Sequence, residues 1–197
     1  NEHELRNLMH TAVYGNDGPF VIRYPRGQGE MTDWQNEPQI LPIGKGRKLR
    51  KGKDIALLSL GAIGNKAAKA IDEAEKLGIS VAHYDMVFLK PIDEEMLNKI
   101  AGKFKYIITV ENGVLKGGLG SAVLEFLSEN NYTETYVHRV GIPDEFVTHG
   151  SISELQQITG IDAAGILEQI IHLYNDMTRN SMLSQNMINP VIQIHNR

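Results

Sequence analysis

The stretch from Tyr106 to Leu127 constrains the fold more than any other, because it reads as a strand, a glycine-rich turn and a helix in succession. Residues 106–110 are apolar and largely β-branched, as in a parallel strand that is buried on both faces. Residues 111–113 are turn formers, which we expect to end the strand. Apolar residues at helical spacing then form one face: Leu119, Ala122, Val123, Phe126 and Leu127. The pattern predicts a helix packed on a sheet.

The glycine turn itself admits two interpretations. Gly117, Gly118 and Gly120 immediately precede the predicted helix, and a helix start after such a turn often binds phosphate. However, neither a G-x-G-x-x-G pattern nor a Walker loop is present. We therefore favour the interpretation that the glycines let the helix pack tightly on the sheet or on a partner, with a nucleotide site as the alternative.

The same alternation of strands and helices continues on both sides of this stretch. Residues 54–61 and 79–87 read as buried strands, and the helix predicted between them, at 65–77, is expected to end at Gly78. The residues expected to face inward from this helix form one apolar stripe: Ala67, Ala68, Ile71, Ala74 and Leu77. Two strands joined by a helix predict a right-handed parallel βαβ unit.

Capping residues mark the remaining helices. We expect helices to begin at Asp93, at the capping box formed by Ser151 and Glu154, and at Asp162, and we expect a last strand at 135–142. The final helix is expected to present an apolar face made of Ile166, Leu167, Ile170, Ile171 and Tyr174. Together the elements predict an α/β protein with a three-layer α/β/α domain from about 44 to 178.

The segments outside this domain are expected to have separate origins. Residues 1–27 read as one helix, at 1–14, and a short strand at 20–22, which cannot bury a core alone. We interpret them as the last αβ unit of a preceding domain, and the chain as a fragment of a longer protein. Residues 28–43 resemble an interdomain linker, with Trp34 as its anchor. The tail at 179–197 is expected to be a loosely held extension or to add an edge strand at 189–194.

Composition excludes several classes of function. The net charge of −4 argues against a nucleic-acid partner, and the absence of cysteine excludes disulfides, thiolate catalysis and cysteine-ligated zinc. The seven histidines lack the close spacing of a metal site. No apolar run has the length of a membrane span and no signal peptide is evident, so we expect a cytoplasmic protein without membrane contact.

Three polar segments could bear function. The basic run at 44–53 suits a phosphate patch or, as we favour, an exposed edge strand. The loop at 141–150 contains Asp144, Glu145 and His149, a set capable of acid–base chemistry, but we favour an ordinary surface loop because no nucleophile accompanies them. Glu111 lies at the carboxyl end of its strand, where α/β sheets commonly place functional groups.

The segment from Arg23 to Gly27 has the most specific pattern. Two arginines, Arg23 and Arg26, flank Pro25 directly after the predicted strand. A stiff segment of this kind presents a guanidinium in a fixed direction, where it can bind an anion. A surface salt bridge is an equally good explanation at this point.

Several motifs together resemble one family. The chain from about 1 to 175 is similar to the C-terminal third of the 1-deoxy-D-xylulose-5-phosphate synthases, a family of transketolase-like thiamine diphosphate enzymes. The resemblance is carried by DGPFVIRYPRG at 17–27, PIGKGR at 42–47, DIALLSLG at 54–61, LGISVAHYDMVFLKPIDEEML at 77–97, TVENGVLKGGLGSAVLEFL at 109–127 and GIPDEFVTHGS at 141–151. The tail from about 179 departs from the family pattern.

The resemblance implies a fold and a reaction. The fold would be a five-stranded mixed sheet with an antiparallel first strand, and residues 1–27 would end a pyrimidine-binding domain. The whole enzyme would be a homodimer that uses thiamine diphosphate and Mg²⁺ to condense pyruvate with glyceraldehyde 3-phosphate. In that reaction carbon dioxide is released and 1-deoxy-D-xylulose 5-phosphate is formed for isoprenoid, thiamine and pyridoxal synthesis.

The resemblance also assigns residues. It implies that the cofactor and metal bind upstream of Asn1, so that this chain has no catalytic, cofactor-binding or metal-binding residue. It implies that Arg26 contacts the phosphate of glyceraldehyde 3-phosphate. The fragment itself would be inactive, structural and dimer-forming. The alternatives are the C-terminal part of another transketolase-like enzyme and a stand-alone, non-catalytic dimerisation module.

Overall fold

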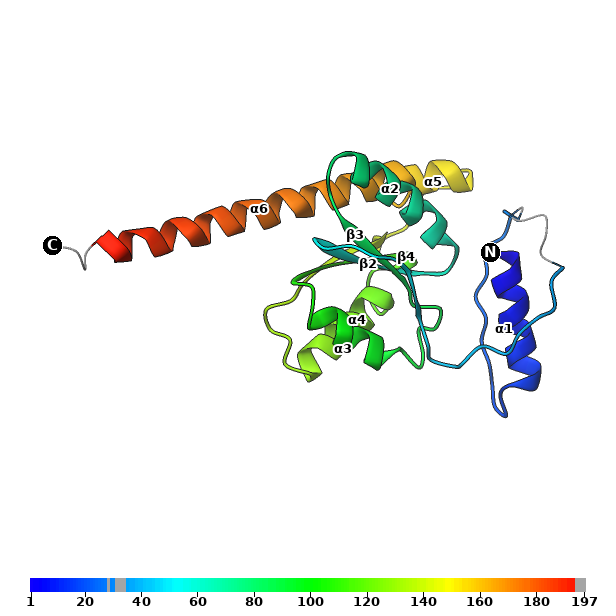
Figure 1. Ribbon diagram of the computed structural model, residues 1–197. Helices are drawn as coiled ribbons and strands as arrows, with labels where there is room; N and C mark the ends of the chain where they lie inside the picture. Colours follow the sequence, from blue (N-terminus) through cyan, green and yellow to red (C-terminus); the bar gives the residue numbers. More distant parts are fainter. Residues whose placement is uncertain (28, 31–34, 194–197) are drawn as a thin grey trace.

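A five-stranded sheet with the order β1-β3-β2-β4-β5 lies at the centre of the computed structural model, which describes residues 1–27, 29–30 and 35–193 (Figure 1). β1 (Arg47–Arg50) is an edge strand antiparallel to β3 (Val81–Asp85). β2 (Ile55–Leu60), β4 (Tyr106–Val114) and β5 (Tyr136–Ile142) run parallel to β3. The structure therefore confirms the predicted mixed α/β sheet and its antiparallel first strand.

Helices cover both faces of this sheet, which makes three layers (Figure 1). α2 (Gly64–Lys76) and α6 (Ala163–Gln193) lie on one face, and α3 (Glu94–Ala101) and α4 (Leu119–Glu129) lie on the other. The remaining helical elements are α1 (Glu2–Tyr14), the short η1 (Gly61–Ile63) and α5 (Ile152–Ile158). Figure 1 shows that α6 continues well past the sheet and that α1 stands beside the domain.

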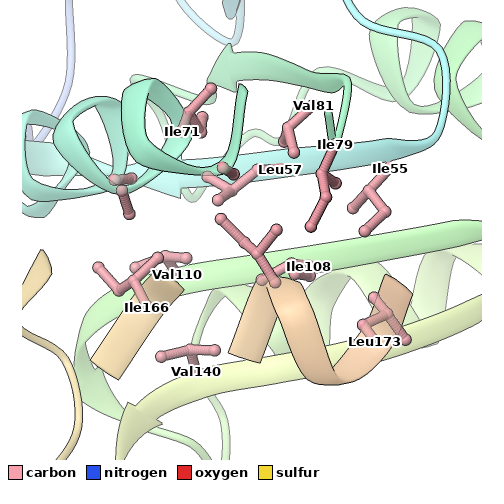
Figure 2. Close-up of a cluster of buried hydrophobic side chains, with 14 of the residues drawn as sticks. Ile55, Leu57, Ile71, Ile79, Val81, Ile108, Val110, Val140, Ile166 and Leu173 are labelled. Carbon is pink, nitrogen blue, oxygen red and sulfur yellow. The ribbon is translucent and has the colours of Figure 1, made fainter. Parts of the chain in front are cut away.

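Two apolar cores hold the layers together because successive strand residues point to opposite faces. On the α2 and α6 face, Leu57 and Ile108 pack against Ile71 and Ile166 (Figure 2). On the α3 and α4 face, the alternate residues of the same strands, such as Leu58, pack against the two helices. Strands that are buried on both faces explain the nearly continuous apolar runs in the sequence.

The predicted helix starts are confirmed in detail. The Asp93 carboxylate accepts a hydrogen bond from the Met96 N–H at 3.0 Å, and the Asp162 carboxylate accepts one from the Gly165 N–H at 2.8 Å. Ser151 begins α5 with both hydrogen bonds of a capping box. Each cap satisfies a backbone N–H that has no partner within its helix.

Three details differ from the expectations. Leu77 is 61% exposed, because α2 ends at Lys76 and the chain turns away at Gly78. Ala70 is buried in place of Ala68, which is only partly buried. Residues 111–113 do not end the strand, since β4 continues to Val114 and pairs with β5 after a shift in register. A bulge accommodates turn-forming residues inside a paired strand.

Two predicted strands are absent from the described part of the chain. Residues 20–22 form no strand and Val21 is 93% exposed, since the structure places no other strand beside them. Residues 189–193 belong to α6, so the proposed edge strand is wrong for them, while residue 194 lies outside the described part. Helical hydrogen bonds are local, whereas a strand requires a neighbouring strand. Trp34, expected to anchor the linker, also lies outside the described residues.

α1 is a helix as predicted, but polar side chains make its buried face. Asn7 and Thr11 are the buried residues, while Met9 from the predicted apolar face is 57% exposed. The side-chain amide oxygen of Asn7 accepts a hydrogen bond from the Gln39 N–H at 2.9 Å, and the Thr11 hydroxyl accepts one from the Leu41 N–H at 2.8 Å. These two bonds hold residues 39–41 along the helix.

Candidate functional site

The carboxyl ends of β2 and β4 meet where the strand order reverses. The chain leaves β2 for β3 on one side and later crosses to β4 on the other side, and Leu60 pairs with Glu111 at this edge. In open α/β sheets the crevice at such a reversal is the usual position of a functional site. Glu111 therefore lies at the edge of the sheet where a functional group was expected.

The carboxylate of Glu111 binds the start of α4. Its two oxygens accept hydrogen bonds from the Leu119 N–H at 2.9 Å and the Gly120 N–H at 3.0 Å. Glu111 is only 5% exposed. The two N–H groups and the positive end of the helix dipole stabilise the buried negative charge. The helix start that could have bound a phosphate is thus occupied by an anion of the same chain.

Glycines make the space for this carboxylate. A Cβ atom at Gly118 would overlap the Glu111 carboxyl group, and one at Gly141 would lie 3.2 Å from Glu111 Cγ. A Cβ atom at Gly120 would lie 2.6 Å from the stem of Arg139. The structure confirms that the glycines of the turn permit close packing, and it gives no support to the nucleotide alternative.

The segment with the two arginines approaches this turn at one point. Arg23 Nη1 and Glu111 Oε2 lie 3.3 and 3.1 Å from the position that a Cβ atom of Gly113 would take. Arg26 is exposed and, among the described residues, has no hydrogen bond or ion pair. The structure therefore brings Arg23 beside the buried carboxylate and leaves Arg26 in solvent.

The basic run at 44–53 contains an edge strand, and the histidine-containing loop at 141–150 is an ordinary surface loop, as we favoured for both. Within the basic run, β1 is an edge strand, and Lys45 pairs with Glu95 at 3.0 Å while Arg50 pairs with Asp72. The loop at 141–150 is a surface loop in which His149 is exposed. Asp144 pairs with Lys116 at 3.0 Å.

A second polar cluster was not predicted from the sequence. A cavity of about 250 Å³ lies between α1 and the carboxyl ends of β2 and β3, and its lining includes Glu4, Arg47, Ser59 and Asp85. Arg47 donates two hydrogen bonds to one oxygen of Asp85, at 3.0 and 2.7 Å, and also pairs with Glu4. The available signal was the occurrence of Ser59, His83 and Asp85 inside otherwise apolar strand sequences.

Neither a metal site nor a membrane segment is found in the described part of the chain. Within the described residues, no three histidine, aspartate or glutamate side chains are grouped so that they could hold a metal ion. Among the helices described, none combines the length and the apolar character needed to cross a membrane.

The sheet order, the antiparallel first strand and the glycine turn define the class of this protein. The family model "Transketolase, C-terminal domain" matches residues 44–166, which is more than half of the chain. The chain therefore belongs to the transketolase C-terminal domain family. A solved split-gene transketolase, described as an inactive β4 tetramer, is 33% identical with a TM-score of 0.64, over 69% of this chain and 44% of that one.

Relatives with higher identity share one name, 1-deoxy-D-xylulose-5-phosphate synthase. The protein from Parabacteroides distasonis is 61% identical over 86% of this chain, and that from Phocaeicola vulgatus is 56% identical over 87%. The protein from Bacteroides thetaiotaomicron is 51% identical over 91%. These matches confirm the resemblance seen in the motifs. The chain spans only 27 to 28% of the length of these relatives.

Proposed function

We propose that this chain is the C-terminal part of a 1-deoxy-D-xylulose-5-phosphate synthase. The identity of 51 to 61% with proteins of that name, over most of this chain, is the observation that carries the proposal. The whole enzyme is a cytoplasmic thiamine diphosphate-dependent transferase that condenses pyruvate and glyceraldehyde 3-phosphate with loss of carbon dioxide. Its product, 1-deoxy-D-xylulose 5-phosphate, enters isoprenoid, thiamine and pyridoxal synthesis.

We assign the thiamine diphosphate and Mg²⁺ to the part of the enzyme upstream of Asn1. Thiamine diphosphate would supply the carbanion chemistry there. The glycine turn of this chain does not fit the diphosphate, because Glu111 already accepts the N–H groups of Leu119 and Gly120. A second anion beside a buried carboxylate would be repelled. The domain organisation follows the same scheme, with residues 1–27 as the end of a pyrimidine-binding domain, 28–43 as a linker, 44–178 as the C-terminal domain and 179–197 as a tail.

Arg26 is our candidate for binding the phosphate of glyceraldehyde 3-phosphate. Its guanidinium is exposed, follows Pro25 directly, and has no partner among the described residues. A planar guanidinium binds a phosphate through two parallel charge-assisted hydrogen bonds. Loss of such a contact typically costs about 1.5–3 kcal/mol, which is roughly a ten- to a hundredfold loss of binding.

Substitution of Arg26 in the full-length enzyme tests this assignment. Arg26→Ala should raise the KM for glyceraldehyde 3-phosphate about ten- to a hundredfold and leave the KM for pyruvate nearly unchanged. Arg26→Lys should recover part of the loss, because an ammonium group cannot make the planar two-point contact. Arg179→Ala, at another exposed arginine, is the matched control. An unchanged KM for the aldehyde, or an equal rise for pyruvate, would return Arg26 to a structural role.

A second candidate function is self-association without catalysis. It is favoured by the similarity to the split-gene transketolase, which is described as an inactive tetramer. By this proposal the chain alone is inactive and contributes to the homodimer of the whole enzyme. Light scattering over a range of concentrations should detect dimers or larger species. A strict monomer at high concentration would show that other parts of the enzyme make the contact.

A further inference from the structure

The buried carboxylate of Glu111 and the guanidinium of Arg23 both approach Gly113. Both groups lie within 3.3 Å of the point that a Cβ atom of Gly113 would occupy, and glycine leaves this point empty. The carboxylate cannot move away, because the N–H groups of Leu119 and Gly120 hold both of its oxygens. A fixed negative charge therefore lies beside the first arginine of the Arg23–Gly27 segment.

The other cations near the glycine turn are engaged elsewhere. Arg139 of β5 packs its stem against Gly120 and donates a hydrogen bond to the Leu115 carbonyl at 3.1 Å. Lys116 pairs with Asp144 at 3.0 Å. Arg23 is exposed and, within the described residues, has no hydrogen bond or ion pair of its own. Of the three, Arg23 is thus the cation that remains available to the field of Glu111.

We propose that Glu111 is a positioning residue, which orients Arg23 and through it the direction in which Arg26 points. Opposite charges attract, and burial of the Glu111 carboxylate reduces the screening below that between two fully exposed groups. Pro25 fixes one backbone angle between the two arginines, so the orientation of Arg23 is transmitted to Arg26. This inference rests on the proposed role of Arg26 in binding the phosphate of the aldehyde.

Gly113→Ala, made in the full-length enzyme, provides the sharpest test. The new methyl group would lie 3.1 Å from Glu111 Oε2 and 3.3 Å from Arg23 Nη1, so it crowds both groups without removing either. We expect a rise of about three- to tenfold in the KM for glyceraldehyde 3-phosphate, with little change for pyruvate or in kcat. Gly18→Ala is the matched control, because the atom nearest to its new methyl group is 4.0 Å away.

Coupling between the two residues distinguishes positioning from a structural role. Arg23→Gln should raise the same KM, and Gly113→Ala should add nothing further in that background, because there is no longer a guanidinium to orient. Glu111→Gln should also raise the KM for glyceraldehyde 3-phosphate. Arg23→Lys, which keeps the positive charge, should raise this KM less than Arg23→Gln does. Additive effects, equal changes for both substrates, or a fall in Tm without a change in KM would overturn the proposal.

The Arg26→Ala variant separates failure of this inference from failure of the proposed function. If Arg26→Ala raises the KM for the aldehyde while Gly113→Ala and Arg23→Gln do not, the positioning role of Glu111 is wrong and phosphate binding by Arg26 stands. If Arg26→Ala itself has no effect, the proposed function of the segment fails and the inference fails with it.

Discussion

The hydroxyl of Ser59 lies 2.8 Å from Nε2 of His83, and both side chains are buried between the sheet and the start of α2. Burial lowers the pKa of His83 to about 4, with a smaller contribution from the charge of Arg50, while Asp85 acts in the opposite direction. His83 is therefore neutral at neutral pH, and its hydrogen bond with Ser59 is one between neutral groups. Protonation of His83 would place an unfavourable charge in the core.

Acid should destabilise the fold through His83. The pKa of His83 is about 6.5 in the unfolded chain and about 4 in the fold. The neutral side chain therefore contributes its full stability above pH 6.5, and this contribution is lost as the pH falls toward 4. Between pH 7 and pH 5 we expect a loss of about 2 kcal/mol in the free energy of unfolding. Urea unfolding measures it. His83→Gln, which keeps a partner for Ser59, should show a clearly smaller loss, and an equal loss would exclude His83 as the cause.

Gly118→Ala should destabilise the domain. The new methyl group would overlap the Glu111 carboxylate and displace it from the start of α4, although the backbone angles at Gly118 are ones that alanine can adopt. We expect a cost of about 1–3 kcal/mol from overpacking and the lost cap. Thermal unfolding checks this, with Gly18→Ala as the control that should change stability by less than about 0.5 kcal/mol. A fully stable Gly118→Ala protein would contradict the account of the glycine turn.

The isolated chain should not bind thiamine diphosphate. The helix start that offers N–H groups to an anion already binds Glu111. Calorimetric titration with the cofactor and Mg²⁺ should give no binding heat beyond dilution. Glu111→Gln should be titrated in the same way, since it removes the internal negative charge that occupies the helix start. A micromolar dissociation constant for the unaltered chain would show that a cofactor site exists in these residues.

Amide hydrogen exchange should be fastest in the first segment of the chain. Val21 and Ile22 lie in an extended stretch where, within the described residues, their N–H groups have no backbone partner. Ile107 and Ile108 lie in the interior strand β4, fully buried and paired on both sides. We expect rapid exchange at the first pair and strong protection at the second in a dilute monomer. Equal protection at both pairs would contradict the finding that, within the described residues, the N–H groups of Val21 and Ile22 have no backbone partner.

Patterns within about ten residues predicted most of the fold. The apolar run at 106–110 and the helical spacing after Leu119 gave β4 and α4, because side-chain burial follows the period of each element. Asp93 and Ser151 marked helix starts correctly, since a cap bonds to an N–H only three residues away. The specific role of Arg26 is still a prediction, because its guanidinium contacts no other described residue that would reveal a partner.

The sequence by itself determined the alternation of strands and helices, the caps and the family, because each depends on local periodicity or on short motifs. Only the tertiary structure decided what occupies the glycine turn. Glu111 reaches N–H groups eight and nine residues later, Gly141 comes from another strand, and Arg23 approaches from far earlier in the chain. Local propensity cannot specify such contacts, since they form only when the sheet brings distant segments together. For the same reason residues 20–22, with strand-forming side chains, form no strand where the structure provides no neighbour.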